Sequence, residues 1–166
     1  MSKYIAAPVT AGILLALAGA AQADTKNATF TVSATVAKAC AIGAGNLIMG
    51  AWSGVGDLTG KSTVSVKCTT GTAYTVDLSP GADSTLADRK LKSGTDLLSY
   101  NLFLDADSSQ IWGDGNDGTF TVGGNGTGMA DAQNRPIDVH ARVLEADLLA
   151  AKPGTYTNII TATVTY

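Results

Sequence analysis

The chain has little of the chemistry on which most enzymes and nucleic-acid-binding proteins depend. Its 166 residues include one histidine and two cysteines, and 11 basic residues stand against 14 acidic ones. The lysines and arginines form no cluster, which argues against a nucleic-acid partner because phosphate binding requires concentrated positive charge. No G-x-S-x-G element occurs, and no phosphate-binding glycine motif lies between a predicted strand and a predicted helix. We therefore expect no enzyme activity and no cofactor.

The residues that could bind a metal or catalyse a reaction have simpler explanations. His140 shares a strand face with Asp138 and Arg142, so a row of exposed polar side chains accounts for it. Two cysteines and one histidine do not complete a four-ligand zinc shell. The loop at residues 113–118 matches a calcium-binding loop only in part, and we interpret it as a tight turn that uses glycines for positive φ. No metal site is expected.

The only long apolar segment lies at the N-terminus and has the features of an export signal. Lys3 supplies a positive charge, residues 11–20 are apolar, and Ala21-Gln22-Ala23 forms a cleavage site of the A-x-A type. The apolar run is too short for a confident membrane span, and a retained N-terminal anchor is the alternative interpretation. We predict that residues 1–23 are a signal peptide and that the mature chain is exported.

Export also bears on the two cysteines, Cys40 and Cys68. An even number of cysteines in an exported protein predicts a single disulfide formed in an oxidising compartment. The alternative is a pair of free buried thiols, which exported proteins rarely keep.

The rest of the sequence predicts an antiparallel all-β domain, either a sandwich or a barrel. It is rich in Thr, Val, Gly, Ser and Asp, has no long amphipathic helix, and is divided into short segments by glycines. Strands of 63–69 and 73–79 are predicted to pair as a hairpin. Further extended segments are predicted at 28–37, 40–52 (interrupted at 43–45), 97–104, 119–122, 136–144 and 156–166, with turns or loops at 54–60 and 123–128, a helical turn or edge strand at 86–91, and one helical turn at 146–151.

The segment after the predicted cleavage site alternates strictly between apolar and polar residues. Between residues 28 and 36, Ala28, Phe30, Val32, Ala34 and Val36 occupy one phase, and threonine and serine occupy the other. A period of two places the apolar side chains on one face of a strand that requires a hydrophobic groove. Periodicity alone leaves two interpretations open: the first strand of a complete sandwich, or a strand donated to a neighbouring copy.

Several segments resemble the spore coat protein U domain, the domain of archaic (Csu-type) chaperone–usher pilins. Residues 98–105, Leu-Ser-Tyr-Asn-Leu-Phe-Leu-Asp, are similar to the family's Y-N-L-[YF] strand, and residues 111–115, Ile-Trp-Gly-Asp-Gly, are similar to its W-G-D-G loop. The strand of Cys68 and the ending at 153–166 also fit, so the resemblance covers essentially the whole mature chain. Residues 47–50 depart slightly from the aromatic–Gly pair usual in the family.

The resemblance implies an incomplete immunoglobulin-like antiparallel β-sandwich that is completed by donor-strand exchange. In such pilins a periplasmic chaperone first fills the cleft left by a missing strand, and the N-terminal extension of the next subunit replaces it at the outer-membrane usher. Carried onto this sequence, the donor residues are Phe30, Val32, Ala34 and Val36. The acceptor groove is expected to be lined by the alternating residues of the last strand, which are Ile160, Ala162, Val164 and Tyr166.

The resulting prediction divides the chain into a signal peptide (1–23), a donor extension (24–37) and a pilin sandwich (38–166). The implied function is that of a structural subunit, which polymerises with other pilin subunits into surface fibres supporting adhesion and biofilm formation. Its partners are a periplasmic chaperone and an outer-membrane usher, and it is expected to be exported through the periplasm to the cell surface or to be secreted. The alternative is a self-contained secreted binding or coat module, which contacts carbohydrate or another surface through Trp112 and the glycine-rich loops. Trp52 and Trp112 together would offer a sugar-stacking platform, although tryptophans more commonly fill a core or pack in a loop.

Overall fold

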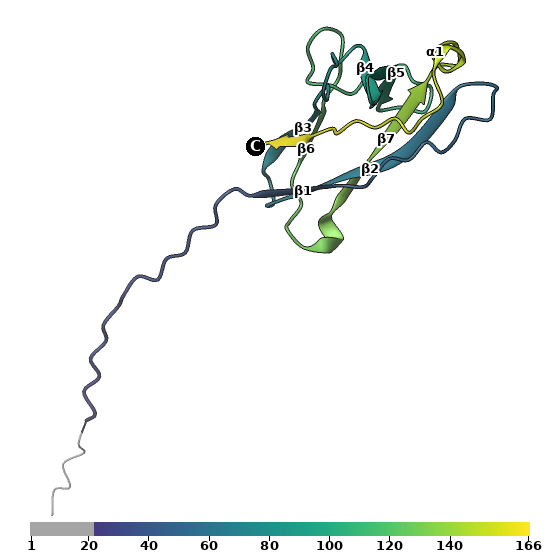
Figure 1. The fold of residues 1–166 in the computed structure, drawn as a ribbon. Coiled ribbons are helices and arrows are strands. Elements are labelled where there is room, and N and C mark those ends of the chain that lie inside the picture. The colour runs from purple at the N-terminus through teal and green to yellow at the C-terminus, as the bar shows by residue number, and fades with distance from the viewer. Residues whose placement is uncertain (1–21) are drawn as a thin grey trace, which may run out of the picture. The chain divides into compact units, whose positions relative to one another are not determined.

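The computed structural model describes residues 22–166, so the predicted signal peptide lies outside the described residues except at positions 22 and 23. The chain divides into an N-terminal unit that ends at Thr35 and a compact unit, Val36–Tyr166. Residues 22–35 contain no helix or strand. Every strand found within residues 22–166 belongs to the compact unit (Figure 1).

The compact unit is an antiparallel β-sandwich, which confirms the predicted all-β fold class. One sheet has five strands in the order β1-β2-β7-β5-β4, and the other has three in the order β6-β3-β8 (Figure 1). The elements are β1 (Cys40–Ala44), β2 (Leu58–Cys68), β3 (Ala73–Leu78), β4 (Arg89–Ser93), β5 (Asp96–Phe103), β6 (Val122–Asn125), a 3₁₀ turn (Asp131–Gln133), β7 (Arg135–Val143), α1 (Glu145–Ala150) and β8 (Ala162–Thr165).

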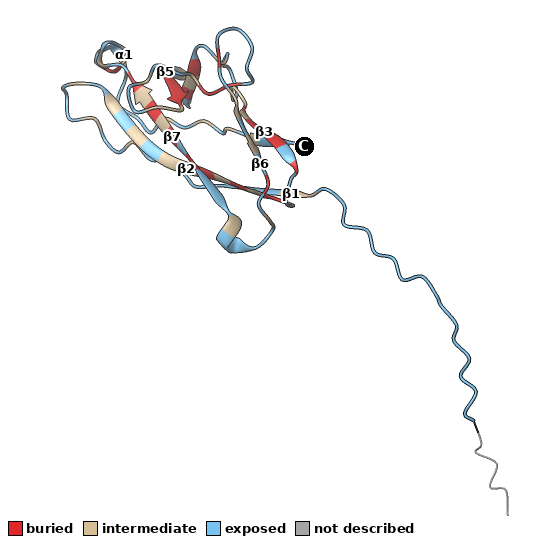
Figure 2. Ribbon diagram, turned by 180° about the vertical axis from the view of Figure 1, so that it is seen from behind, coloured by how far each residue is buried: buried red, intermediate tan, exposed pale blue. Residues whose placement is uncertain are grey.

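The core lies between the two sheets and follows the alternation of the strands. From Val64 to the end of β2 and along β3 every second residue is buried, and the intervening residues are more exposed. Each larger side chain that is fully buried contributes roughly 1.5–3 kcal/mol to stability. Figure 2 shows the buried positions along β3, β5 and β7. The buried apolar residues of this core are Val64, Val66, Cys68, Tyr74, Val76, Leu78, Leu91, Leu98, Tyr100, Leu102, Trp112, Ile137, Val139, Ala141, Val143 and Leu148.

The predicted hairpin of residues 63–69 and 73–79 is wrong. Both segments are strands, but β2 pairs with β1 and β7, whereas β3 pairs with β6 and β8. The short connection between them crosses from one sheet to the other, and its Gly71 N–H donates to the carbonyl of Gly126 beside β6 (2.8 Å). The inner faces of β2 and β3 therefore meet across the core, because alternation identifies a buried face without specifying which strand lies beside it.

The remaining segments differ from expectation mainly in length. The ambiguous segment at 86–91 contributes to the edge strand β4, and the helical turn at 146–151 corresponds to α1. β6 occupies part of 123–128, where a loop was predicted, and β2 begins within the predicted turn at 54–60. The extended segments at 40–52 and 156–166 retain only the short strands β1 and β8.

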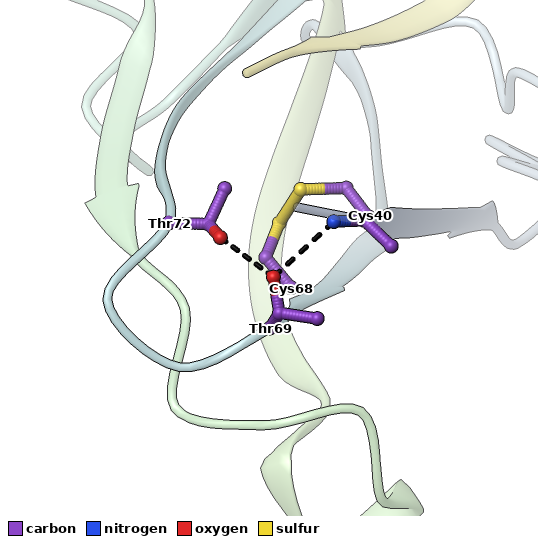
Figure 3. The surroundings of a disulfide bond; sticks show 5 residues. Cys40, Cys68, Thr69 and Thr72 are labelled. Carbon is purple, nitrogen blue, oxygen red and sulfur yellow. Dashed lines mark hydrogen bonds between the residues drawn. A yellow bond between two sulfur atoms is a disulfide. The ribbon is translucent and has the colours of Figure 1, made fainter. Parts of the chain in front are cut away.

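The predicted disulfide between Cys40 and Cys68 is confirmed. The two cysteines lie directly opposite each other in the pairing of β1 with β2, with Cα atoms 4.1 Å apart. Next to them, the N–H of Ala39 donates to Oγ1 of Thr69 (3.2 Å), which is also hydrogen-bonded to Oγ1 of Thr72 (2.6 Å; Figure 3). The disulfide thus fixes the start of the edge strand β1 to the more central β2.

Loss of the disulfide is expected to lower the free energy of unfolding by about 3.5 kcal/mol, because the bond restricts the unfolded chain over a 28-residue separation. Urea unfolding followed by tryptophan fluorescence, with and without reductant, measures the change. A chain carrying both Cys40→Ser and Cys68→Ser serves as the control, since its unfolding midpoint should not respond to reductant. An unchanged midpoint on reduction of the native chain would contradict the expectation.

Candidate functional site: an open edge of the sandwich

The three-stranded sheet ends at β8, which pairs with β3 on one side only among residues 22–166. The N–H of Ser79 donates to the carbonyl of Thr161 (2.9 Å), and this bond shows which residues of β8 direct their backbone groups toward β3. The backbone groups of Thr163 and Thr165 face β3, whereas those of Ala162 and Val164 point away from it. A row of unpaired N–H and C=O groups of this kind is a template for pairing with another chain.

Side chains on the inner face of β8 are only half-buried, although their neighbours on β3 are fully buried. Val164 lies opposite Val76, and Ala162 lies opposite Leu78, so each pair shares one face of the sheet. Val76 and Leu78 are 0% and 3% exposed, while both partners on β8 are intermediate. This difference in burial follows from the positions of the two strands. Within residues 22–166, β3 has a neighbouring strand on each side, whereas β8 has a neighbouring strand on one side only.

β1 is an edge strand of the five-stranded sheet, and it lies near β8 (Figure 1). Two unpaired strand edges, one from each sheet, are therefore neighbours on this side of the sandwich. We call this region the open edge and define it by β1, β8 and the half-buried residues Ile160, Ala162 and Val164. It is apolar on the inside and carries unpaired backbone groups on β8.

The inner face of β2 beyond β1 is covered by a loop. Leu47 and Met49 are half-buried against the core and lie over Gly60, where an added Cβ would come within 2.9 Å of Cδ2 of Leu47 and 2.7 Å of Cγ of Met49. Gly60 is therefore required for this close approach. Trp52, in the same loop, is half-buried, and its Nε1 donates to the carbonyl of Gly56 (2.8 Å).

Three of the four predicted groove residues lie on the inner side of the open edge. Ile160, Ala162 and Val164 are half-buried against the core, whereas Tyr166 lies past the end of β8 and is 55% exposed. The sequence predicted an extended segment at 40–52 but did not assign β1, or the half-buried residues of the loop after it, to the groove. Residues 47–49 are all apolar, so the sequence carries no alternation that would show which of them, Leu47 and Met49, turn toward the core.

The predicted donor residues form an exposed apolar row. Phe30, Val32 and Val36 are 87%, 82% and 87% exposed, and Ala34 is also exposed. No helix or strand includes these residues. An apolar row with this degree of exposure is unfavourable in water, and it gains stability wherever it becomes buried.

Trp52 and Trp112 pack in a loop and in the core, which is the commoner setting for tryptophan, and the alternative of a sugar-stacking platform is wrong for Trp112. That side chain is fully buried in the core, and its Nε1 donates to the carbonyl of Val76 (3.0 Å). The side chain of Trp52 is half-buried, and its indole N–H is engaged within its own loop. The two rings therefore form no exposed surface on which a sugar could stack.

The other candidate residues lie in ordinary structural settings. His140 sits on β7 between Lys61 of β2 and Phe103 of β5, and Asp138 forms an ion pair with Lys61 (2.8 Å). Within the described part of the chain, no group of three or more His, Cys, Asp or Glu side chains is arranged to hold a metal ion. Residues 22–166 also include no helix with the length and apolarity needed to span a bilayer.

The loop at 113–118 is the tight turn that the sequence predicts. Gly115 and Gly118 have φ values of 84° and 78°, a conformation that favours glycine. Oδ1 of Asp114 accepts the N–H of Asn116 (2.9 Å), and this bond lowers the pKa of the Asp114 carboxyl below its ordinary value. The Asp114 carboxylate thus serves to hydrogen-bond the backbone of its own loop.

The comparisons with known proteins agree with this geometry. The sequence profile described as Spore Coat Protein U domain matches residues 26–163. The chain belongs to the spore coat protein U domain family. Protein U of Myxococcus xanthus is 31% identical over 183 aligned positions, which cover 99% of this chain and 98% of that relative.

A solved structure shares the fold of this spore coat protein U domain. It is the CsuC–CsuE chaperone–tip adhesion subunit pre-assembly complex from the archaic chaperone–usher Csu pili of Acinetobacter baumannii. The TM-score is 0.57 and the sequence identity is 21%, with 80% of this chain covered. The present chain spans 40% of the matched chain, so the likeness concerns the fold of one part of it.

Hydrogen exchange should distinguish the two sides of β8. In the monomeric chain we expect the amides of Ala162 and Val164 to exchange rapidly, because they point away from β3, and those of Thr163 and Thr165 to be protected. Exchange followed residue by residue by NMR tests this pattern, with the amides of β7, which lies between two strands, as the protected reference. Equal protection of all four β8 amides would mean that a further strand covers the edge.

Proposed function

We propose that this protein is a structural pilin subunit that polymerises by donor-strand exchange into chaperone–usher surface fibres. The observation that carries the proposal is the half-buried row of Ile160, Ala162 and Val164 on a strand that has only one neighbour. An added strand would bury this row and would pair with the free backbone of β8. The function requires no catalysis and no cofactor.

The donor in this proposal is the N-terminal segment of another copy. Burial of Phe30, Val32 and Val36 would contribute roughly 1.5–3 kcal/mol for each side chain, and backbone hydrogen bonds would add to this. Because these contacts would have to be lost together, the fibre should dissociate slowly. We assign residues 24–37 to the donor extension and residues 38–166 to the acceptor sandwich.

The same proposal sets the location and the partners. A chain with an open edge needs protection during export, since an unpaired apolar edge promotes aggregation. We infer that a periplasmic chaperone covers the edge first, that an outer-membrane usher exchanges it for the next subunit, and that the fibre serves adhesion and biofilm formation at the cell surface. Membership in a family whose fold recurs in a chaperone–subunit pre-assembly complex supports this sequence of partners.

Replacement of Val32 by Asp in the mature chain should abolish fibre formation. A carboxylate on the apolar face of the donor would have to be buried without a partner, which should slow assembly about 100-fold or more. Thr31→Asp is the matched control, because Thr31 lies on the opposite face of the same segment and its substitution leaves the apolar row intact. Assembly is followed by electron microscopy and by the ladder of bands on an unboiled gel.

The gel also provides the outcome that would reject the proposal. Fibres that form equally well from the Val32→Asp and wild-type chains would exclude the N-terminal segment as the donor. Loss of fibres in the Thr31→Asp chain as well would show that added charge, and not burial of one face, controls assembly.

A mixture of two defective chains should reveal the polarity of assembly. Val32→Asp disables the donor and Val164→Asp disables the acceptor, so each chain alone should stay monomeric and the mixture should stop at a dimer. Size-exclusion chromatography with light scattering measures the masses. Thr163→Asp is the control for β8, because this residue faces outward and the variant should still polymerise. Polymers of the Val164→Asp chain alone would place the acceptor elsewhere.

A further inference from the structure

A buried charge lies close to the end of β3, and the proposed function does not use it. Arg89, on the edge strand β4, is 0% exposed. Within the described residues it forms no salt bridge with a carboxylate. Burial lowers the pKa of its guanidinium to about 10, so the group still carries its charge at neutral pH. A buried charge without a counter-ion is costly unless hydrogen bonds compensate for it.

The compensation comes from acceptors on three separate parts of the chain. Nη1 of Arg89 donates to Oδ1 of Asn101 on β5 (2.6 Å), and Nη2 donates to the carbonyl of Trp112 (2.7 Å). Nε and Nη2 both donate to the carbonyl of Ser79 (3.2 and 3.1 Å). The rigid fork of donors in a guanidinium suits this arrangement, in which two nitrogens hold one carbonyl.

Ser79 connects this charge to the open edge. It directly follows β3, its N–H donates to the carbonyl of Thr161, and its Oγ accepts the N–H of Thr161 (both 2.9 Å). Thr161 immediately precedes β8. Arg89 thus holds the carbonyl of Ser79, while the N–H and hydroxyl of Ser79 hold Thr161, the residue just before β8.

The strands that carry Arg89 and Asn101 also hold the segment that leads into β8. The backbone groups of Lys92 on β4 and Thr157 exchange two hydrogen bonds (2.8 and 3.0 Å). The side-chain amide of Asn158 donates to the hydroxyl of Tyr100 on β5 (3.3 Å). The approach to β8 is therefore attached to β4 and β5 of the other sheet, and Ser79 is the last attachment before the strand begins.

We propose that Arg89 and Ser79 are positioning residues, which hold β8 in the register that an incoming donor strand requires. The inference rests on the proposed function, because it concerns how the open edge accepts a donor. β8 has four residues and pairs with a single strand within residues 22–166, so its register rests on β3, on the apolar face of the strand and on the attachment at Ser79. A slip of one residue would turn Thr163 and Thr165 inward and Ala162 and Val164 outward, which would remove the apolar row that the donor has to contact.

The experiment uses the mature chain carrying Val32→Asp, which can accept a donor but cannot provide one. A synthetic peptide of residues 26–38 is the probe, and its capture rate is measured by fluorescence anisotropy. In this background Ser79→Ala removes the acceptor for the N–H of Thr161 and leaves the carbonyl that binds Arg89 in place. Ser109→Ala is the matched control, because it removes a hydroxyl that donates to Asp105 (2.9 Å) in an exposed turn.

We expect Ser79→Ala to slow peptide capture about fivefold to tenfold, the equivalent of one lost hydrogen bond, and Ser109→Ala to leave it unchanged. The amides of Thr161, Thr163 and Thr165 should lose protection from hydrogen exchange, while the amides of β7 keep theirs. This selectivity separates positioning of β8 from a general loss of stability, which would affect both sets of amides. In the Arg89→Met chain, the amides at the end of β3 should lose protection from hydrogen exchange as well.

The inference is overturned if Ser79→Ala and Ser109→Ala capture the peptide equally fast, or if the amides of β7 and β8 lose protection together. If the Arg89→Met chain does not fold, the peptide capture and hydrogen exchange of the Ser79→Ala chain are sufficient to test the inference. Failure of the parent chain to capture the peptide would instead refute the proposed function. The exchange comparison between Ser79→Ala and the parent would then still decide whether Ser79 holds β8 in place.

Discussion

In the described part of the chain β8 pairs on one side only, and this is the constraint from which the other features of the structure follow. It leaves Val164 half-buried beside a fully buried Val76, although both residues lie on the same face of one sheet. It also leaves backbone groups that a complete sandwich would satisfy with a neighbouring strand. A fold with this defect has to be stabilised from its remaining parts, and the structure shows two such stabilising features at the two neighbouring edges.

The first is the disulfide, which ties the beginning of β1 to β2, and the second is the hydrogen-bond network of Arg89. Covalent attachment suits β1 because none of its residues is fully buried and only Cys40 is half-buried, so packing alone contributes little. β8 has no such bond and is held by its pairing with β3 and by Ser79, whose carbonyl is held by a buried guanidinium. Both features fix an edge strand without covering its free side, and the open edge thus stays accessible to a partner.

Much of the fold could be predicted from the sequence, and the failures have a common physical cause. Alternation located β2, β3, β5 and β7, because each has one face in the core. It could not identify which strands are neighbours, and hence the hairpin prediction was wrong. Arg89 was not identified, because a single arginine in a polar segment carries no pattern, and its burial depends on carbonyls that the tertiary fold supplies. The inner face of β8 was predictable, whereas its incomplete burial depends on the absence of a neighbour in three dimensions.

The two faces of the proposed donor also match the strand that it would join. β8 places Ala162 and Val164 inside and threonines 163 and 165 outside. The N-terminal segment alternates in the same way, with alanine, valine or phenylalanine in one phase and threonine or serine in the other. A strand of this composition laid beside β8 would continue the inner apolar face and extend the outer face with threonine, a residue suited to strands and able to form cross-strand pairs. One register then satisfies the side chains of both faces and the free backbone of the edge, whereas a slip of one residue would bury the hydroxyl face of the donor and expose its apolar row.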